Sequence, residues 1–403
     1  MTGSWEVLDL VARWIHVIAG IMWVGNSMLF NWLDRSLVSA DRAGQTPRPA
    51  GTIWLLHSGG FYYVEKTLLE GATMPPRVHW FKWQAYTTWL SGASLLVIVY
   101  YAGGRAVLAD ASIADLTHWQ AVAVGVGAIV AGTAIYEWMQ SPRAQRTPRL
   151  STAVWIGALA AISVALTQLL SGRAALLHAG AMLATIMAAN VGHTIVPSQR
   201  KLVASVSEGR GPDQAVSDRA KRVSIHNNYY TFPVIVLMLV SHFPAIYGHR
   251  WNWLLMLLLA AGGAGARYAL NSRWTYAGWK PALGGTIAAT LIAVLAVLNL
   301  GAPSAVSASS AYSAASAASF EEVRHVVDRR CGVCHSSRPT DVTFGPAPAG
   351  VMFDTPQQIM MHAARIRERA SISRTMPPAN KTGITEAERA LLDRWVTAGA
   401  TVE

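Results

Sequence analysis

Eight stretches of this sequence run for about 20 residues or more with few or no charged side chains, which is the length of helix that crosses the hydrocarbon core of a bilayer. Hydrophobic residues make up 52% of the 403-residue chain and charged residues only 14%, far from the usage of soluble domains. We therefore predict an all-α fold dominated by an eight-helix transmembrane bundle. The predicted spans are residues 7–33, 84–104, 118–141, 151–172, 174–196, 229–248, 251–272 and 280–300.

The formal net charge of +11 follows the loops between these spans. Lys and Arg gather in the loops after spans one, three, five and seven, whereas the loops after spans two, four and six carry one each. Because cytoplasmic loops retain basic residues, this asymmetry predicts that both termini lie outside the cytoplasm, which for a bacterial inner-membrane protein is the periplasm. Residues 320–403 carry 11 basic and 10 acidic side chains, so the excess belongs to the membrane part and nucleic acid is not an expected partner.

Three domains follow from the change in composition along the chain. Residues 1–300 form the predicted membrane domain, and residues 301–319 an Ala/Ser-rich linker without charge. If the linker is flexible, its 18 residues from 302 to 319 span roughly 23 Å. Residues 320–403 form a small tail domain. Ser319 with Glu322, and Thr385 with Glu388, fit capping boxes that begin helices, and Phe320 and Trp395 are expected to pack where those helices cross.

The two cysteines of the chain lie in Cys331-Gly332-Val333-Cys334-His335. In this pattern both thiols bond a haem and the histidine ligates its iron. A thioredoxin-like pair or half of a zinc site leaves the adjacent histidine unexplained, and there is no second cysteine pair. The motif predicts one covalent haem c in a tail that resembles a class I cytochrome c. The charge asymmetry independently places it outside the cytoplasm.

A thioether is the expected second axial ligand of this haem. We choose Met376, because Thr375-Met376-Pro377-Pro378 is a rigid loop before the last predicted helix and resembles the distal-ligand loop of small cytochromes c. The other candidates are Met352, Met360 and Met361, which lie in or near an amphipathic segment.

Ionisable side chains inside membrane spans are expensive and usually face a cavity or a partner. Arg13, Glu137 and Arg267 lie near helix ends, where a snorkelling side chain explains them equally well. The histidines are layered across the bilayer, and paired imidazoles in a helical bundle hold b-type haems. A relay haem b is therefore a further prediction, although any one histidine also fits an ordinary hydrogen-bonded interior residue. The candidates are His16, His178 and His242 in the outer half and His193 and His226 in the inner half.

The order of features along the chain also fits a parallel repeat of four helices. Spans one and five both place a histidine near the outer end, and each precedes a long basic loop. Tyr86-Thr87 and Tyr230-Thr231 open spans two and six.

Two loop clusters on the cytoplasmic side combine aromatic, amide and charged groups. They are residues 57–66, which end in Lys66, and residues 226–233, which contain Asn227, Asn228 and Tyr229. They fit interfacial aromatic belts with capping asparagines, or a site for a planar, hydrogen-bonding anion. Arg13 with His16 is the competing site at the outer face.

The chain resembles the bacterial membrane-bound urate oxidase (urate hydroxylase) family along essentially its whole length. The resemblance depends on eight spans, a CxxCH tail and four segments: Arg13-Trp14-Ile15-His16, Trp23-Val24-Gly25-Asn26, Gly59-Gly60-Phe61-Tyr62 and His226-Asn227-Asn228-Tyr229.

The resemblance implies a function in purine catabolism. Urate would be oxidised to 5-hydroxyisourate, and its electrons would pass through the haem to a downstream cytochrome or terminal oxidase of the respiratory chain. Two alternatives remain from the residues: a non-catalytic haem subunit that anchors a partner dehydrogenase, and a haem or copper transport protein, which leaves the tail unexplained.

Overall fold

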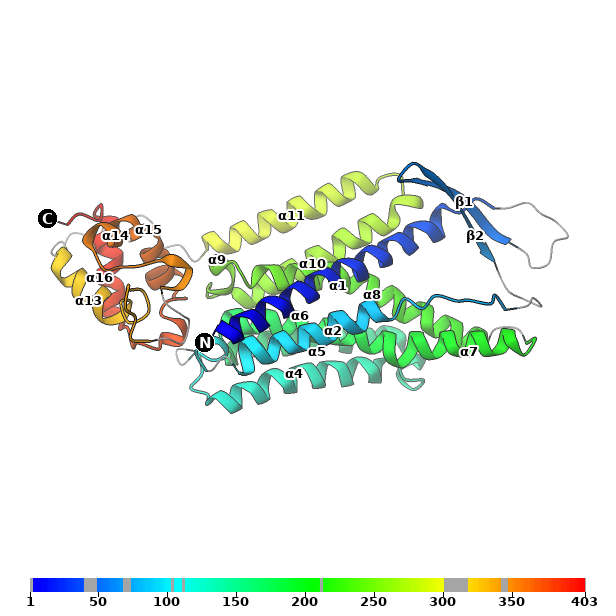
Figure 1. The fold of residues 1–403 in the computed structure, drawn as a ribbon, viewed down its shortest axis with the longest axis horizontal. Helices are drawn as coiled ribbons and strands as arrows, with labels where there is room; N and C mark the ends of the chain where they lie inside the picture. The colour runs from blue at the N-terminus through cyan, green and yellow to red at the C-terminus, as the bar shows by residue number, and fades with distance from the viewer. Residues whose placement is uncertain are drawn as a thin grey trace.

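The computed structural model describes residues 3–39, 49–67, 74–102, 105–110, 113–210, 213–300, 318–341 and 347–402. Nearly all of the predicted Ala/Ser-rich linker lies outside these ranges. The chain is mostly helical and forms a long bundle with a smaller helical body at one end (Figure 1).

Seven helical stretches of the described chain are long and apolar enough to cross a membrane, which makes this a multi-pass membrane protein. They are formed by α1 (Gly3–Ser36), α4 (His118–Met139), α5 (Pro148–Leu169), the continuous run of α6 (Gly172–Ala189), the π-helical η3 (Asn190–Ile195) and α7 (Val196–Ser207), then α8 (Gln214–Val240), α10 (Asn252–Asn271) with η4 (Ser272–Trp274), and α11 (Trp279–Asn299).

The remaining predicted span, residues 84–104, is helical but is not among these seven. It forms α2 (Trp83–Leu95) and the π-helical η1 (Leu96–Tyr101), and it lies along α1 (Figure 1). Its first half carries Gln84, Thr87 and Thr88, which lower its hydropathy. The count of eight spans therefore stays a prediction.

Helix α6 is the centre of the bundle, packed against α4, α5 and α8. Close packing depends on small residues at the crossings, as is usual between membrane helices. A Cβ added at Gly132 of α4 would overlap the Met182 sulfur, and one at Gly180 would lie 3.2 Å from Leu237 of α8.

Two predicted loop regions are in fact regular structure. Residues 49–67 form an antiparallel hairpin of β1 (Pro49–His57) and β2 (Gly60–Thr67), so the expectation of an all-α fold is wrong there. Ser58 and Gly59 both have positive φ, 49° and 76°, as a two-residue hairpin turn of type I′ requires. Residues 226–233 lie inside α8, which begins 15 residues before the predicted span.

The tail is a compact helical body with its own core around Trp395 and Leu392. Both predicted capping boxes are confirmed, on α13 through Ser319 and Glu322 and on α16 through Thr385 and Glu388. The Phe320 and Trp395 rings lie 5.9 Å apart, as expected for crossing helices. Its elements are α13 (Phe320–Arg330), η5 (Pro348–Gly350), α14 (Pro356–Met361), α15 (Ala363–Ile366), η6 (Arg367–Ile372), η7 (Pro378–Asn380) and α16 (Glu386–Thr397).

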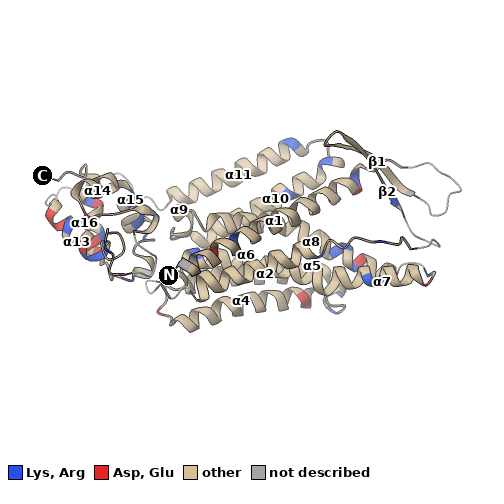
Figure 2. Ribbon diagram, viewed as in Figure 1, with Lys and Arg blue, Asp and Glu red and all other residues tan. Residues whose placement is uncertain are grey.

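The N-terminus of α1 and the tail lie at the same end of the bundle, and the hairpin and α7 lie at the other (Figure 1). We call these the tail end and the hairpin end. Basic side chains gather at the hairpin end, whereas the middle of the helices is mostly free of charge (Figure 2).

Candidate functional site

The Cys331-to-His335 motif continues directly from the last turn of α13. The amide of Cys331 donates to Val327 O at 2.8 Å, and the amides of Cys334 and His335 donate to Cys331 O at 3.1 and 2.9 Å. This tight turn brings both sulfurs and the imidazole to one cavity, which all three residues line.

The His335 ring has a defined orientation. Its Nδ1 lies 3.0 Å from the carbonyl oxygen of Val351, and its ring centroid lies 5.2 Å from that of Phe353. Because a carbonyl can only accept, Nδ1 carries the proton and Nε2 keeps its lone pair. A histidine held in this way presents Nε2 to a metal ion.

Among the four candidate methionines, Met376 is the one that lines the cavity containing Cys331, Cys334 and His335. Its backbone is held on both sides: its amide donates to Arg369 O at 2.9 Å, and Arg389 Nη1 donates to its carbonyl at 3.0 Å. Met361 is 77% exposed, and Met360 packs against the core of the tail.

Burial raises the pKa of the Cys331 thiol to about 12, with a further contribution from the neighbouring Cys334. Burial and then Asp341 also raise the pKa of Cys334. Both groups are therefore neutral thiols at physiological pH when nothing is bonded to them.

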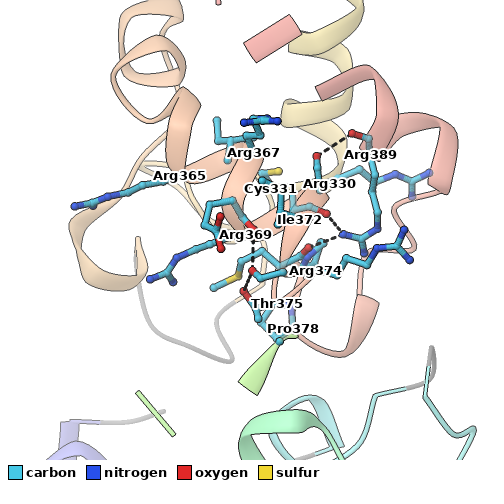
Figure 3. A pocket seen from close by; sticks show the side chains of 18 of the residues that line it. Arg330, Cys331, Arg365, Arg367, Arg369, Ile372, Arg374, Thr375, Pro378 and Arg389 are labelled. Carbon is cyan, nitrogen blue, oxygen red and sulfur yellow. Dashed lines mark hydrogen bonds between the residues drawn. The ribbon is translucent and has the colours of Figure 1, made fainter. Parts of the chain in front are cut away.

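The cavity lies between the tail and the tail end of the bundle and has a volume of about 2010 Å³. The bundle contributes the end of α5, the start of α6 and the loop after α9 (Pro244–Tyr247). Figure 3 shows the arginine side chains that the tail contributes around Cys331. Ten basic and four acidic side chains line the cavity.

Most of the tail's arginines there are already paired. Arg330 lies 3.0 Å from Glu388, Arg367 lies 2.6 Å from Asp393, and Arg374 lies 2.6 Å from Glu386. On the bundle side, Arg250 donates to Leu300 O at 2.8 Å. Arg173, on the first turn of α6, has a buried Nε without a hydrogen-bond partner among the described residues.

The tail and the bundle touch closely at Gly248, just after α9. A Cβ at this position would lie 2.5 Å from Ser373 O and 2.7 Å from Cγ2 of Thr375. Next to this contact, α3 (Arg105–Leu108) packs against η7. The tail is therefore docked against the bundle through backbone that leaves no room for a side chain.

Inside the bundle, a buried polar network joins α4, the start of η3 and α8. Asn190 Nδ2 donates to Asn227 Oδ1 at 2.8 Å and to Tyr136 Oη at 2.9 Å. The Tyr136 hydroxyl also lies 2.8 Å from His226 Nδ1, which Gln140 approaches to 3.0 Å.

The structure does not bring the predicted catalytic residues together. Asn227 lies in the buried network, and Asn228 accepts from Arg267 and Asn271 at 2.9 and 2.7 Å. Tyr229 is half-buried on the next position of α8. Lys66 is on the exposed hairpin, paired with Asp34 at 2.7 Å, and Arg13 pairs with Asp9 at 2.8 Å on α1.

The five predicted haem b histidines lie on α1, α6, η3 and α8 and just after α8. Both ring nitrogens of His178 are engaged, with Ala174 O at 2.7 Å and Tyr101 Oη at 3.0 Å, and His16 Nδ1 lies 3.0 Å from Thr88 O. His193 is largely exposed and pairs with Glu137, and His242 is exposed. Within the described ranges, no hydrogen bond or ring contact joins any two of the five.

Sequence reasoning misses two parts of this arrangement. Asn190 and Tyr136 are uncharged, so a search for ionisable residues passes over them. Arg173 and Arg250 stand out in the sequence only as loop charges. Their signal is the charge asymmetry itself, because they are two of the three basic residues in the loops after spans two, four and six.

Fold and site together define a multi-pass helical membrane protein with a docked helical tail that carries a CxxCH turn. The family model described as urate oxidase N-terminal matches residues 2–299, so the chain belongs to this family. The match covers the membrane part and stops before the tail. No curated protein and no solved structure matches the chain.

Proposed function

We propose that this protein is a membrane-bound urate oxidase that converts urate to 5-hydroxyisourate and passes the electrons to haem c in its tail. The observation that carries the proposal is the combination of a urate oxidase family match over the bundle with a tail cavity that Cys331, Cys334, His335 and Met376 all line. From there the electrons leave to a downstream cytochrome or terminal oxidase.

The residues of the tail suit a covalent haem c. Cys331 and Cys334 would form its thioether bonds, and His335 Nε2 and the Met376 sulfur would ligate its iron. Ligand pockets usually measure about 300–1,000 Å³, so a cavity of about 2010 Å³ has room for the haem and more. The haem would accept electrons one at a time. The cap on α16 and the Arg330–Glu388 pair hold the surrounding helices in place.

We place the tail in the periplasm of a bacterial inner membrane. The support is the excess of Lys and Arg at the hairpin end, which the positive-inside rule assigns to the cytoplasm. The three domains at 1–300, 301–319 and 320–403 belong to the same proposal.

The histidines proposed for a haem b inside the bundle have other surroundings in this structure. His178 has no free ring nitrogen in this arrangement, and His193 and His242 face outward. The bundle haem therefore stays a prediction. Pyridine haemochrome analysis of pure protein decides it, because extractable haem b beside one haem c per chain would establish it.

The experiment that tests the proposal adds urate anaerobically to the purified protein and follows haem c reduction by absorption. Reduction without any second polypeptide is the expected result. If dithionite reduces the haem but urate does not, the protein is instead an electron-transfer subunit of a partner dehydrogenase.

A further inference from the structure

The cavity at the tail end is lined by more residues than those proposed to bind the haem. It contains all four proposed haem-binding residues, yet a substantial part of its wall belongs to the bundle, including the end of α5, the start of α6 and the loop after α9. A substrate bound against that wall would lie in the same cavity as the haem.

The inner cluster on α8, the alternative urate site, lies farther from the haem cavity than the bundle residues that line this cavity. Asn227 is the middle residue of α8, and 13 residues, roughly 20 Å of helix, separate it from the end of α8 at Val240. Tunnelling decays steeply with distance, so a site at Asn227 needs a relay group between it and the tail. A site at the tail end needs no relay.

The bundle wall offers the groups that a planar, hydrogen-bonding anion requires. Arg173 supplies a guanidinium whose Nε has no partner among the described residues, and no carboxylate of the described chain forms an ion pair with it. Two amides line the cavity with it. Gln168 makes only a 3.4 Å contact with Thr167, and Asn252 donates to Tyr247 O at 3.0 Å, which leaves its oxygen free to accept.

These groups are held by backbone packing. A Cβ at Gly172 would overlap Tyr247 O and would lie 2.9 Å from Asn252 Nδ2, so the start of α6 is in contact with the loop that precedes α10. Arg173 follows directly. The position of Arg173 is therefore fixed by the close contact of α6 with the end of α9 and the start of α10.

The charge of the cavity favours an anion. Basic side chains outnumber acidic ones by ten to four, and the excess persists among the described bundle residues that line the cavity, which include Arg173, Arg250 and Asp110. Such an imbalance in a partly enclosed site raises the local concentration of anions.

We propose that urate binds at the tail end of the bundle, on Arg173, Gln168 and Asn252, in the cavity shared with the haem. This rests on the proposed function and assigns its substrate site. One water oxygen bonds to C5 of the urate monoanion, which gives neutral 5-hydroxyisourate, one proton and two electrons. The two electrons would pass singly to a ferric haem c held by Cys331, Cys334, His335 and Met376, and a downstream one-electron acceptor would reoxidise that haem between the two steps.

The sharpest test is sidedness. Full-length, haem-loaded protein is reconstituted into sealed liposomes, and vesicles with the tail outward are identified by protease access to the tail. Urate added outside should reduce the haem of these vesicles as completely as it does in detergent. Reduction only when urate is enclosed inside overturns the proposal and favours the inner clusters. No reduction even in detergent refutes the proposed function itself.

Substitutions then test the named residues. Arg173→Ala should raise the KM for urate at least about tenfold, the loss expected for one charge-assisted hydrogen bond, while ascorbate still reduces the haem fully. Arg149→Ala is the matched control, because Arg149 is exposed at the other end of α5. A KM unchanged in Arg173→Ala and in Gln168→Ala removes these residues from the site.

Discussion

The tail keeps the groups proposed to bind a haem largely in one run of five residues, whereas the bundle spreads its polar groups over several helices. Cys331 to His335 share one turn, but Asn190 meets Tyr136 and Asn227 from positions 54 and 37 residues away. A contiguous motif can be recognised from the sequence alone, and a dispersed site becomes visible only when the fold assembles it. The comparison also distinguishes two kinds of variant. One kind loses the proposed haem, and the other keeps the haem but receives electrons from the bundle more slowly.

The largest effect should come from removing the haem attachment. Replacing Cys331 and Cys334 with Ser should abolish urate-driven electron transfer and leave no haem that survives denaturation and acidic acetone. The bundle should still insert, because its helices pack against one another. Haem that is fully extractable from the unmodified protein would contradict covalent attachment.

A smaller effect is expected at the axial position. Met376→Ala should leave the haem attached but alter its spin state and potential, because the weak axial ligand is gone. Absorption spectra and redox titration measure both. Met361→Ala is the control, since that side chain is 77% exposed. An unaltered spectrum in Met376→Ala would move the ligand to Met352 or Met360.

Docking of the tail can be weakened from the bundle side, without replacing any of the four proposed haem-binding residues. Gly248→Ala places a Cβ where Ser373 O lies 2.5 Å away, so the tail must shift. We expect urate-driven haem reduction to slow several-fold in stopped-flow measurements, with ascorbate reduction unchanged. Gly157→Ala serves as the control, because nothing lies within 4 Å of its added Cβ. Equal rates in both variants would show that docking is not needed for electron transfer.

The smallest effect concerns the stability of the tail alone. Thr385→Ala removes the cap of α16 and should destabilise the tail by about 1 kcal/mol, measured by thermal unfolding at the haem absorption band. Ser319→Ala, which removes the cap of α13, is the matched comparison. No change in either variant would show that the caps do not limit stability.

The same cap predicts a pH dependence. Burial alone would raise the pKa of Glu388, but hydrogen bonds from Thr385 and Arg330 outweigh it and hold that pKa below its ordinary 4.5. A carboxyl with a lowered folded pKa stabilises above its unfolded value and loses this contribution as pH falls through the folded one. The stability lost in Glu388→Gln should therefore shrink below about pH 4.5.

The tail can be predicted in detail because its signals are local. Ser319 with Glu322 and Thr385 with Glu388 lie three residues apart, and both capping boxes are found in the structure. The hairpin cannot be predicted in the same way. Its residues resemble a loop because they sit between membrane spans, although Ser58-Gly59 between runs of alternating apolar residues is a turn signal.

Hydropathy predicts that the long helices exist, but it does not predict the residues at which they begin and end. Helix α8 begins at Gln214 in a charged segment, which a search for apolar runs leaves out. The grouping of Arg173 with Gln168 and Asn252 depends on how the ends of three segments meet, and no periodicity along the chain carries that information.

The contact at Gly248 has a kinetic consequence. An electron acceptor that diffuses freely would make oxidation a second-order process, whose rate falls on dilution. In the proposed reaction, a tail covalently continuous with the bundle and seated against it would make the first transfer unimolecular, with an effective concentration set by geometry. Only the exit of electrons to the next carrier then depends on encounter, and that carrier must approach the tail from a face that the bundle does not cover.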